Sequence, residues 1–147
     1  MPVVRYLALV AVAGLALAGC GGSSMSSTTN STANAQAQIR SAYQQLFSPQ
    51  TSLNDRVAVL QNGPKFKSVV AGFASNPLAK KVSVTVSKVQ LQGSDQAKVV
   101  YTVKFGGTSL PTQTGSAVVQ NGTWKVGFAS LCKLVALGGS TPSACKS

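Results

Sequence analysis

The feature that most constrains the fold is a change in the spacing of apolar residues at Lys81. Before it, apolar residues recur every three or four positions, which is typical of amphipathic helices. After it, apolar and polar residues alternate, as in strands with one buried face, and the alternation changes phase at Ser87-Lys88, which predicts a bulge or bend. This order of patterns predicts an α+β domain in which helices pack on an antiparallel sheet.

The helical half is interrupted by Ser48-Pro49, Asn62-Gly63-Pro64 and Asn76-Pro77. We therefore expect three short helices, the second of them capped by Ser52 and running through Leu60. The residues expected to face inward are Ile39, Ala42, Tyr43, Leu46, Phe47, Val57, Leu60, Phe66, Val69, Val70 and Phe73.

The alternating half predicts four strands, over residues 82–91, 97–105, 113–120 and 123–129. Gly93-Ser94-Asp95 is expected to turn the chain between the first two. Asn121-Gly122 lies between the last two, and Asn-Gly is a strong hairpin signal because both residues tolerate positive φ. We expect Ser130 to cap a terminal helix that ends at Gly138-Gly139 and buries Leu131, Leu134, Val135 and Leu137.

The N-terminus has the layout of a bacterial secretory signal. Arg5 is the only charge before an apolar run from Tyr6 to Ala18, and that run is shorter than the roughly 20 residues that span a bilayer. It ends in Leu17-Ala18-Gly19-Cys20, which matches a lipobox. We expect removal of residues 1–19 and lipidation of Cys20, which would hold the chain on the extracytoplasmic face of the cell membrane. The alternatives are an uncleaved anchor helix and an ordinary signal with a chance cysteine.

Residues 20–33 consist mostly of Gly, Ser, Thr and Asn. Such a segment buries little apolar surface, so we expect a flexible linker between the lipid and the domain. The folded domain is expected to cover residues 34–147.

Cys132 and Cys145 could form a redox site, part of a metal site or a structural disulfide. The chain has no His and no Glu, and its only carboxylate side chains are Asp55 and Asp95, so no metal site is expected. Twelve residues separate the two cysteines, whereas a thioredoxin-like motif has two. With Cys20 acylated, these two remain as a pair in an oxidising compartment, where we expect a disulfide.

The chain is strongly basic, with 13 Lys and Arg against 2 Asp and Glu. Loss of Arg5 with the signal leaves a formal charge of 12 − 2 = +10. The basic residues are dispersed and no basic-aromatic motif is present, so nucleic acid is not an expected partner. Anionic lipid, a cell-wall polymer or another envelope protein are the expected ones.

Residues from about 35 to 137 resemble the mycobacterial low-molecular-weight secreted antigen family and related actinobacterial lipoproteins. The resemblance is carried by "ANAQAQIRSAYQQLFSPQTSLNDRVAVLQNG", "VSVTVSKVQLQGSDQAKVVYTVKF" and above all "QTGSAVVQNGTWKVGFASLCKLVALGG". It implies an exported protein with an NTF2-like (cystatin-like) domain, in which three N-terminal helices pack on a curved four-stranded antiparallel sheet, followed by a short C-terminal helix. The lipobox is a departure from the antigen, which has an ordinary signal.

We do not expect an enzyme or a cofactor. Acid-base catalysis needs a suitably placed titratable group, and Asp55 and Asp95 are expected to be local caps or solvated charges. A non-catalytic binding or interaction module at the cell surface is the expected function. The alternative is a carrier of a small apolar ligand in an NTF2-like cavity, which an open volume of about 300 Å³ or more would favour. Either that cavity or a filled core accounts for the inward aromatic residues Tyr43, Phe47, Phe73, Tyr101, Phe105, Trp124 and Phe128.

Overall fold

The computed structural model describes residues 24–146, so the expected signal peptide and Cys20 lie outside the described residues. Its helices are α1 (Ser24–Phe47), α2 (Leu53–Ala58), α3 (Lys67–Ser75) and α4 (Phe128–Leu137), with short 3-10 segments η1 (Gly63–Phe66), η2 (Pro77–Lys81) and η3 (Ser143–Cys145). Its strands are β1 (Val82–Leu91), β2 (Gln96–Phe105), β3 (Thr108–Ser109), β4 (Gln113–Gln120) and β5 (Thr123–Val126).

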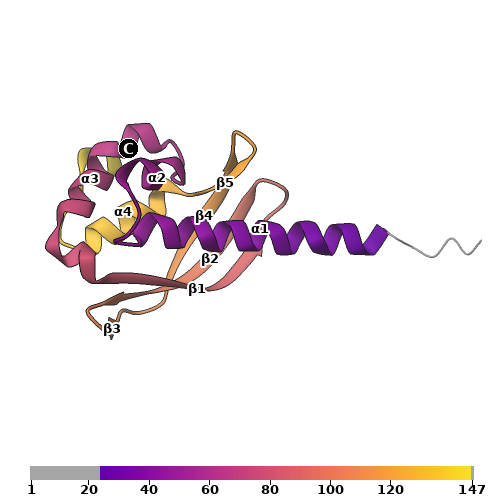
Figure 1. Cartoon of the computed structure of the whole chain (residues 1–147), viewed down its shortest axis with the longest axis horizontal. Helices are drawn as coiled ribbons and strands as arrows, with labels where there is room; N and C mark the ends of the chain where they lie inside the picture. The colour runs from indigo at the N-terminus through magenta and orange to yellow at the C-terminus, as the bar shows by residue number, and fades with distance from the viewer. Residues whose placement is uncertain (1–23, 147) are drawn as a thin grey trace, which may run out of the picture.

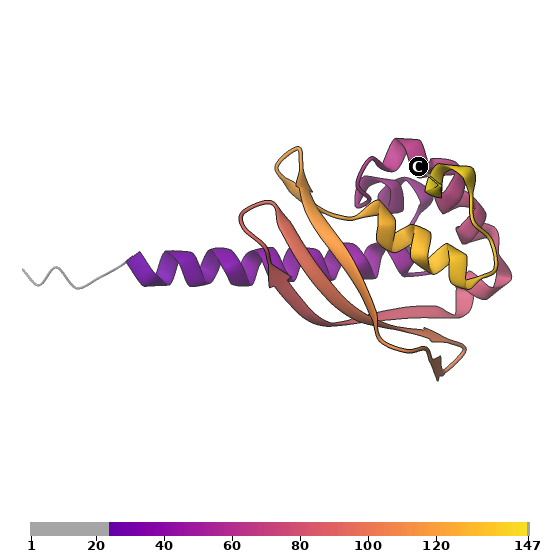
Figure 2. The ribbon, with the colours of Figure 1, turned by 180° about the vertical axis from the view of Figure 1, so that it is seen from behind.

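The strands form one curved antiparallel sheet in the order β1-β2-β4-β5, with the short β3 paired to β2. Helix α1 lies across one face of the sheet, and its N-terminal part extends beyond it (Figure 1). Helices α2, α3 and α4 gather at the opposite end of the molecule, as the reverse view also shows (Figure 2). The expected α+β architecture, with helices on a curved sheet and a short C-terminal helix, is confirmed.

Two local predictions in the sheet are also confirmed. The β1–β2 register shifts between Val86 and Lys88, so Ser87 is the extra residue of a bulge. The β4–β5 turn consists of Asn121 and Gly122, whose φ values are 53° and 73°. Both positive angles suit a two-residue hairpin turn.

The linker prediction is wrong over residues 24–33, because α1 begins at Ser24 and not near Asn34. No Gly or Pro interrupts residues 24–47. Once the packed half of this helix has formed, extension adds one hydrogen bond for each residue fixed, so a polar sequence of moderate helix propensity continues it.

The prediction for the C-terminal helix is wrong at its start. Strand β5 ends at Val126, Gly127 is the N-cap of α4 and makes no side-chain cap, and Phe128 belongs to the helix. Ser130 does not cap the helix because its hydroxyl is buried and bonded elsewhere: it accepts from the Ser116 amide at 3.0 Å and lies 2.9 Å from the Tyr43 hydroxyl. Leu137, expected to be inward, is 51% exposed.

The core lies between α1 and the sheet and continues beneath α3 and α4. Its buried members all fall between Ile39 and Leu134, and the partly buried residues packed on it extend from Ala35 to Cys145. The buried core of the described chain therefore lies entirely within residues 24–146, so a chain that begins at Ser24 retains all of it. Between Ser24 and Lys146, no helix combines the length and the apolar character needed to cross a bilayer.

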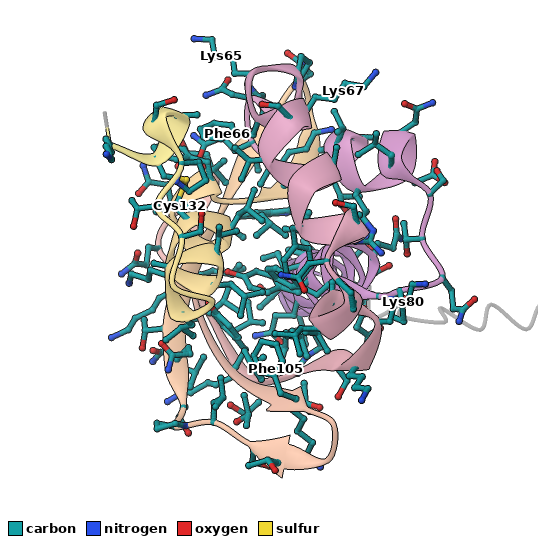
Figure 3. The ribbon with its side chains drawn as sticks, turned by 90° about the vertical axis from the view of Figure 1, so that its left-hand side faces the viewer. Lys65, Phe66, Lys67, Lys80, Phe105 and Cys132 are labelled. Carbon is teal, nitrogen blue, oxygen red and sulfur yellow. A yellow bond between two sulfur atoms is a disulfide. The ribbon has the colours of Figure 1, made fainter. Side chains whose placement is uncertain are left out.

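The expected disulfide is present. Cys132 in α4 is bonded to Cys145 in η3, with their Cα atoms 5.5 Å apart. The bond ties the last residues of the described chain back onto the terminal helix. Figure 3 looks onto this end of the molecule, with Cys132 on α4 at one side and Lys80 of η2 at the other.

Candidate ligand-binding cavity

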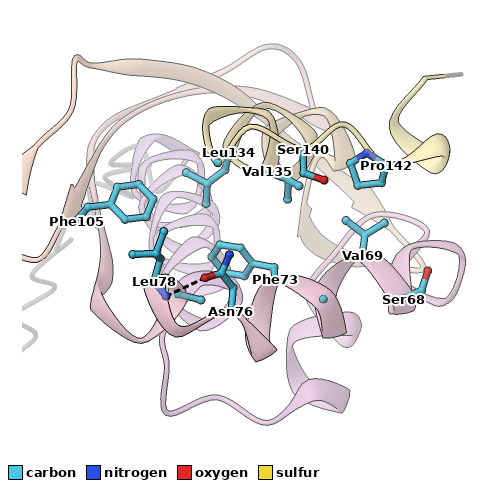
Figure 4. Close-up of a pocket in the computed structure, with 13 residues that line it drawn as sticks. Ser68, Val69, Phe73, Asn76, Leu78, Phe105, Leu134, Val135, Ser140 and Pro142 are labelled. Atoms are coloured by element: carbon cyan, nitrogen blue, oxygen red, sulfur yellow. Dashed lines mark hydrogen bonds between the residues drawn. The ribbon is translucent and has the colours of Figure 1, made fainter.

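An open cavity of about 330 Å³ lies at the end of the molecule where α3 and η2 face α4 and the tail (Figure 4). Phe105, from the end of β2, lies at one end of it, and Ser68 and Pro142 lie at the other (Figure 4). The lining consists of Ser68, Val69, Gly72, Phe73, Asn76, Leu78, Ala79, Phe105, Leu134, Val135, Gly138, Ser140 and Pro142.

One wall is set by the junction of α3 and η2. Pro77 opens η2, and the Asn76 side chain caps it by accepting a hydrogen bond from the Leu78 amide at 2.9 Å. This cap fixes the turn that brings Leu78 to the cavity. Leu78 remains 57% exposed, which makes the rim of the cavity apolar.

The other wall consists of α4 and the tail that follows it. Gly138 ends the helix, and Gly139, at φ 80°, lets the chain turn back. Ser140 and Pro142 of the returning chain then line the cavity. The Gly138 and Gly139 amides bond to α4, and the Cys145 amide bonds to Pro142, so these bonds are local. The Cys132–Cys145 disulfide and the packing of Ala144 on the core hold the tail against the rest of the domain.

Of the seven aromatic residues expected around a pocket, only Phe73 and Phe105 line the cavity. The other five are part of the core or pack at its edge. Tyr43, Phe47 and Tyr101 are 0–1% exposed and Trp124 is 9% exposed, whereas the Phe128 ring stacks on Phe66 with centroids 5.2 Å apart. For these five, the structure shows the alternative in which they fill the core.

The space between α1 and the sheet is closed by a buried polar cluster. The Tyr43 hydroxyl donates to the Ser116 carbonyl at 2.9 Å and is also bonded to Ser130 Oγ. Gly115 makes room for the cluster, since a Cβ at this position would lie 2.3 Å from Ser130 Oγ and 2.5 Å from the Tyr43 hydroxyl oxygen. The space in which the sequence led us to expect a cavity is therefore filled by the protein's own side chains.

Burial also keeps both core tyrosines neutral. It raises the pKa of Tyr43 far above its ordinary value, and it raises the pKa of Tyr101 to about 12. Among the described residues, the Tyr101 hydroxyl has no hydrogen-bond partner. Both side chains are fully buried, so a substrate in solvent does not reach them.

The carboxylates have the local positions expected for them. Asp55 is exposed on α2 and accepts a hydrogen bond from the capping Ser52 hydroxyl at 2.6 Å, and Asp95 is exposed in the β1–β2 turn. Within residues 24–146, no group of three or more potential metal ligands occurs.

Sequence reasoning missed the buried side chain of Arg56, which is only 4% exposed. Its guanidinium donates to the carbonyls of Thr51 at 3.0 Å and Ser48 at 2.5 Å, and burial lowers its pKa. These bonds show that Arg56 holds the loop between α1 and α2, which is a structural role.

A second hollow, of about 510 Å³, lies between the α2–η1 segment and the β4–β5 hairpin. Its polar groups already bond to one another across the hollow. Gln120 Nε2 donates to Asn62 Oδ1 at 2.8 Å, its Oε1 accepts from the Asn62 amide at 3.0 Å, and Lys125 Nζ donates to the Ala58 carbonyl. This hollow is therefore a weaker candidate than the cavity beside α3.

Comparison with known proteins supplies the family. Residues 32–142 match the model of the C-terminal domain of low molecular weight antigen MTB12. The chain belongs to this family. The match includes α3, η2, α4 and the tail as far as Pro142, so every residue that lines the cavity falls inside the MTB12 domain.

None of the curated proteins matches this MTB12-family chain. Among solved structures, it is similar to an NTF-2 like protein of unknown function from Shewanella oneidensis MR-1. The two share 13% identity at a TM-score of 0.41, over 67% of this chain and 93% of the other.

Proposed function

We propose that this protein is an exported, lipid-anchored, non-catalytic binding module of the cell envelope that holds a small apolar ligand in the cavity beside α3. The observation that carries the proposal is an open cavity of about 330 Å³ that is lined mostly by apolar residues. This volume falls in the usual range for ligand sites, roughly 300–1,000 Å³.

The apolar character of the cavity favours binding over a purely structural role. Apolar surface left in water forgoes about 25 cal/mol of stabilisation for each Å². Leu78 nevertheless stays more than half exposed at the rim, and Phe73 and Phe105 stay partly exposed. An apolar ligand would cover these side chains and recover the stabilisation.

The chemistry of the lining supports a non-catalytic role. None of the thirteen described lining residues has an ionisable side chain. The tyrosines that could exchange protons are sealed in the core, and Asp55 serves the cap of α2. The cavity can therefore enclose a molecule but offers no general acid or base to it.

Export and anchoring are supported by the lipobox at Cys20, by membership of a secreted antigen family and by the disulfide, which persists in oxidising compartments. Helix α1 begins at the end of the molecule opposite α3 and α4 (Figures 1 and 2), which border the cavity. A lipid on Cys20 would therefore present the cavity away from the anchoring membrane. Mass spectrometry of the protein from its own host should find an N-terminal acylated Cys20, and an unmodified Met1 would contradict the anchor.

Blocking the cavity tests the binding role. Gly72 lines it, and a Cβ at this position would meet nothing within 4 Å, so Gly72→Leu places a bulky apolar side chain at the lining without a clash at Cβ. Replacing a helical glycine also favours the helix. Native mass spectrometry from the host should detect a bound apolar molecule in the wild type and in Gly72→Ala, and at least tenfold less in Gly72→Leu.

A bare wild-type mass, or equal occupancy in Gly72→Leu, would contradict the cavity as a ligand site. In that case the lysine-rich surface becomes the better candidate for the binding site. Binding to envelope fractions that weakens strongly with salt would then support an interaction module.

A further inference from the structure

Building on the proposed function, we infer that the ligand is a single-chain anionic amphiphile. Its apolar chain lies in the cavity between α3 and α4, and its negatively charged head group, a carboxylate or a phosphate, stays outside at Lys81, beside Phe105.

The lining restricts what can enter the cavity. Most lining side chains are aliphatic or aromatic, and the polar ones are Ser68, Asn76 and Ser140. Asn76 already uses its side-chain oxygen on the Leu78 amide. Burying a charge without a partner is very costly, so a charged group of the ligand must remain at the rim.

The volume restricts the number of chains. At about 330 Å³, the cavity lies near the lower limit of ligand sites, which is roughly 300 Å³. One chain fits such a space better than two. A lipid with a single chain is therefore favoured over a two-chain membrane lipid.

The backbone of Lys81 is held next to Phe105, which lies at one end of the cavity. Its carbonyl accepts a hydrogen bond from the Gly106 amide at 2.9 Å, and a Cβ on Gly106 would lie 3.8 Å from Lys81 Cδ. The Lys81 side chain thus lies against the turn that directly follows Phe105. Its exposed ammonium is a compact, hydrated charge on a flexible stem, which suits a head group in water.

The charge at this end of the cavity is not neutralised by an acidic side chain. Lys80 and Lys104 adjoin lining residues in the sequence and are exposed. Asp95 precedes the far end of β2, a strand of ten residues, so it lies about 30 Å away. The other acidic side chain of the sequence, Asp55 on α2, is bonded to the capping Ser52 hydroxyl. The positive charge at this end of the cavity therefore favours an anionic head group.

The test measures the binding of four probes to residues 24–147 by calorimetry, each below its micelle concentration. The probes are decanoate, decyl phosphate, decanol and decyltrimethylammonium, which share one chain and differ in the head group. We expect the two anions to bind at least fivefold more tightly than decanol and the cation to bind most weakly. A preference for one anion over the other distinguishes a carboxylate from a phosphate source.

The Lys81→Gln variant should lose about fivefold in decanoate affinity and leave decanol binding unchanged. Lys98→Gln is the matched control, because Lys98 is exposed near the opposite end of β2 and should affect neither probe. Equal binding of decanol and decanoate, or equal decanoate binding by Lys81→Gln and wild type, would overturn the anionic ligand while leaving the proposed function intact. No binding of any probe would overturn both.

Discussion

The space beneath α1 and the space beside α3 are both bounded by aromatic side chains, yet one is closed and the other is open. Beneath α1, Tyr43 and Tyr101 pack with ring centroids 5.2 Å apart, and Tyr43 is anchored by Ser116 and Ser130. Beside α3, Phe73 and Phe105 border an open volume. The difference shows that an inward aromatic residue indicates a ligand site only where the opposing elements leave space.

The two regions also differ in how they are held together. The closed region is packed between a long helix and the central strands, with a hydrogen-bonded cluster at its centre. One wall of the open region is a short tail attached by a disulfide. We therefore expect changes in the first region to act mainly on stability and changes in the second mainly on binding.

The largest contrast is expected between two phenylalanine truncations. Phe47→Ala removes a side chain that is 1% exposed and should lower the free energy of unfolding by about 3–5 kcal/mol. Phe105→Ala removes a partly exposed side chain beside an existing cavity and should lower it by less than about 2 kcal/mol. Urea unfolding measures both, and equal losses would contradict the distinction between the two regions.

Removing the disulfide should also have a large effect. The bond closes a loop with a sequence separation of 13, so Cys132→Ser with Cys145→Ser should cost about 3 kcal/mol on the chain-entropy model. Hydrogen exchange should rise in residues 138–146 and stay unchanged at Val99 and Val103. Equally increased exchange in the central strands would show that the tail is not a separately attached wall.

A smaller effect should separate the two core tyrosines. Tyr43→Phe breaks the bonds to Ser116 and Ser130 and should cost about 1–2 kcal/mol of unfolding free energy. The Tyr101 hydroxyl has no hydrogen-bond partner within residues 24–146, so Tyr101→Phe should be neutral or slightly stabilising. Thermal and urea unfolding of the two variants measures this, and a larger loss in Tyr101→Phe would contradict the described hydrogen bonds.

The smallest effect is a loss of stability in alkali. Burial raises the pKa of Tyr101 to about 12, whereas the unfolded side chain titrates near 10. Stability from this group is full below pH 10 and falls as the pH rises towards 12, because the unfolded state releases its proton first. At pH 10.5 the share of the loss that comes from Tyr101 should be below about 1 kcal/mol, and Tyr101→Phe should lack this share while it keeps the loss that comes from the buried Tyr43. An identical pH profile for this variant would contradict the assignment.

The sequence predicted the parts of the fold that depend on local patterns. Alternation located β1, β2 and β4, the phase change located the bulge at Ser87, and Asn121-Gly122 located the hairpin turn. These signals lie within a few residues of the feature that they predict. The sheet could therefore be predicted before any tertiary contact was known.

The features that were missed depend on contacts between distant residues. Ser130 looked like a helix cap, but its hydroxyl bonds to Tyr43, 87 residues away. The cavity depends on how far α3 lies from α4, on the turn at Leu78 and on the tail at Pro142. No local pattern encodes that separation, so only Phe73 and Phe105 of the lining were among the predicted pocket residues.

The central claim is that an apolar ligand binds beside α3 and not beneath α1. Methyl NMR of residues 24–147 titrated with decanoate tests it most directly. We predict saturable shifts of the methyl groups of Val69, Leu78, Leu134 and Val135, with those of Val99 and Val103 unchanged. Shifts confined to Val99 and Val103, or no saturable shift in either group, would contradict the claim.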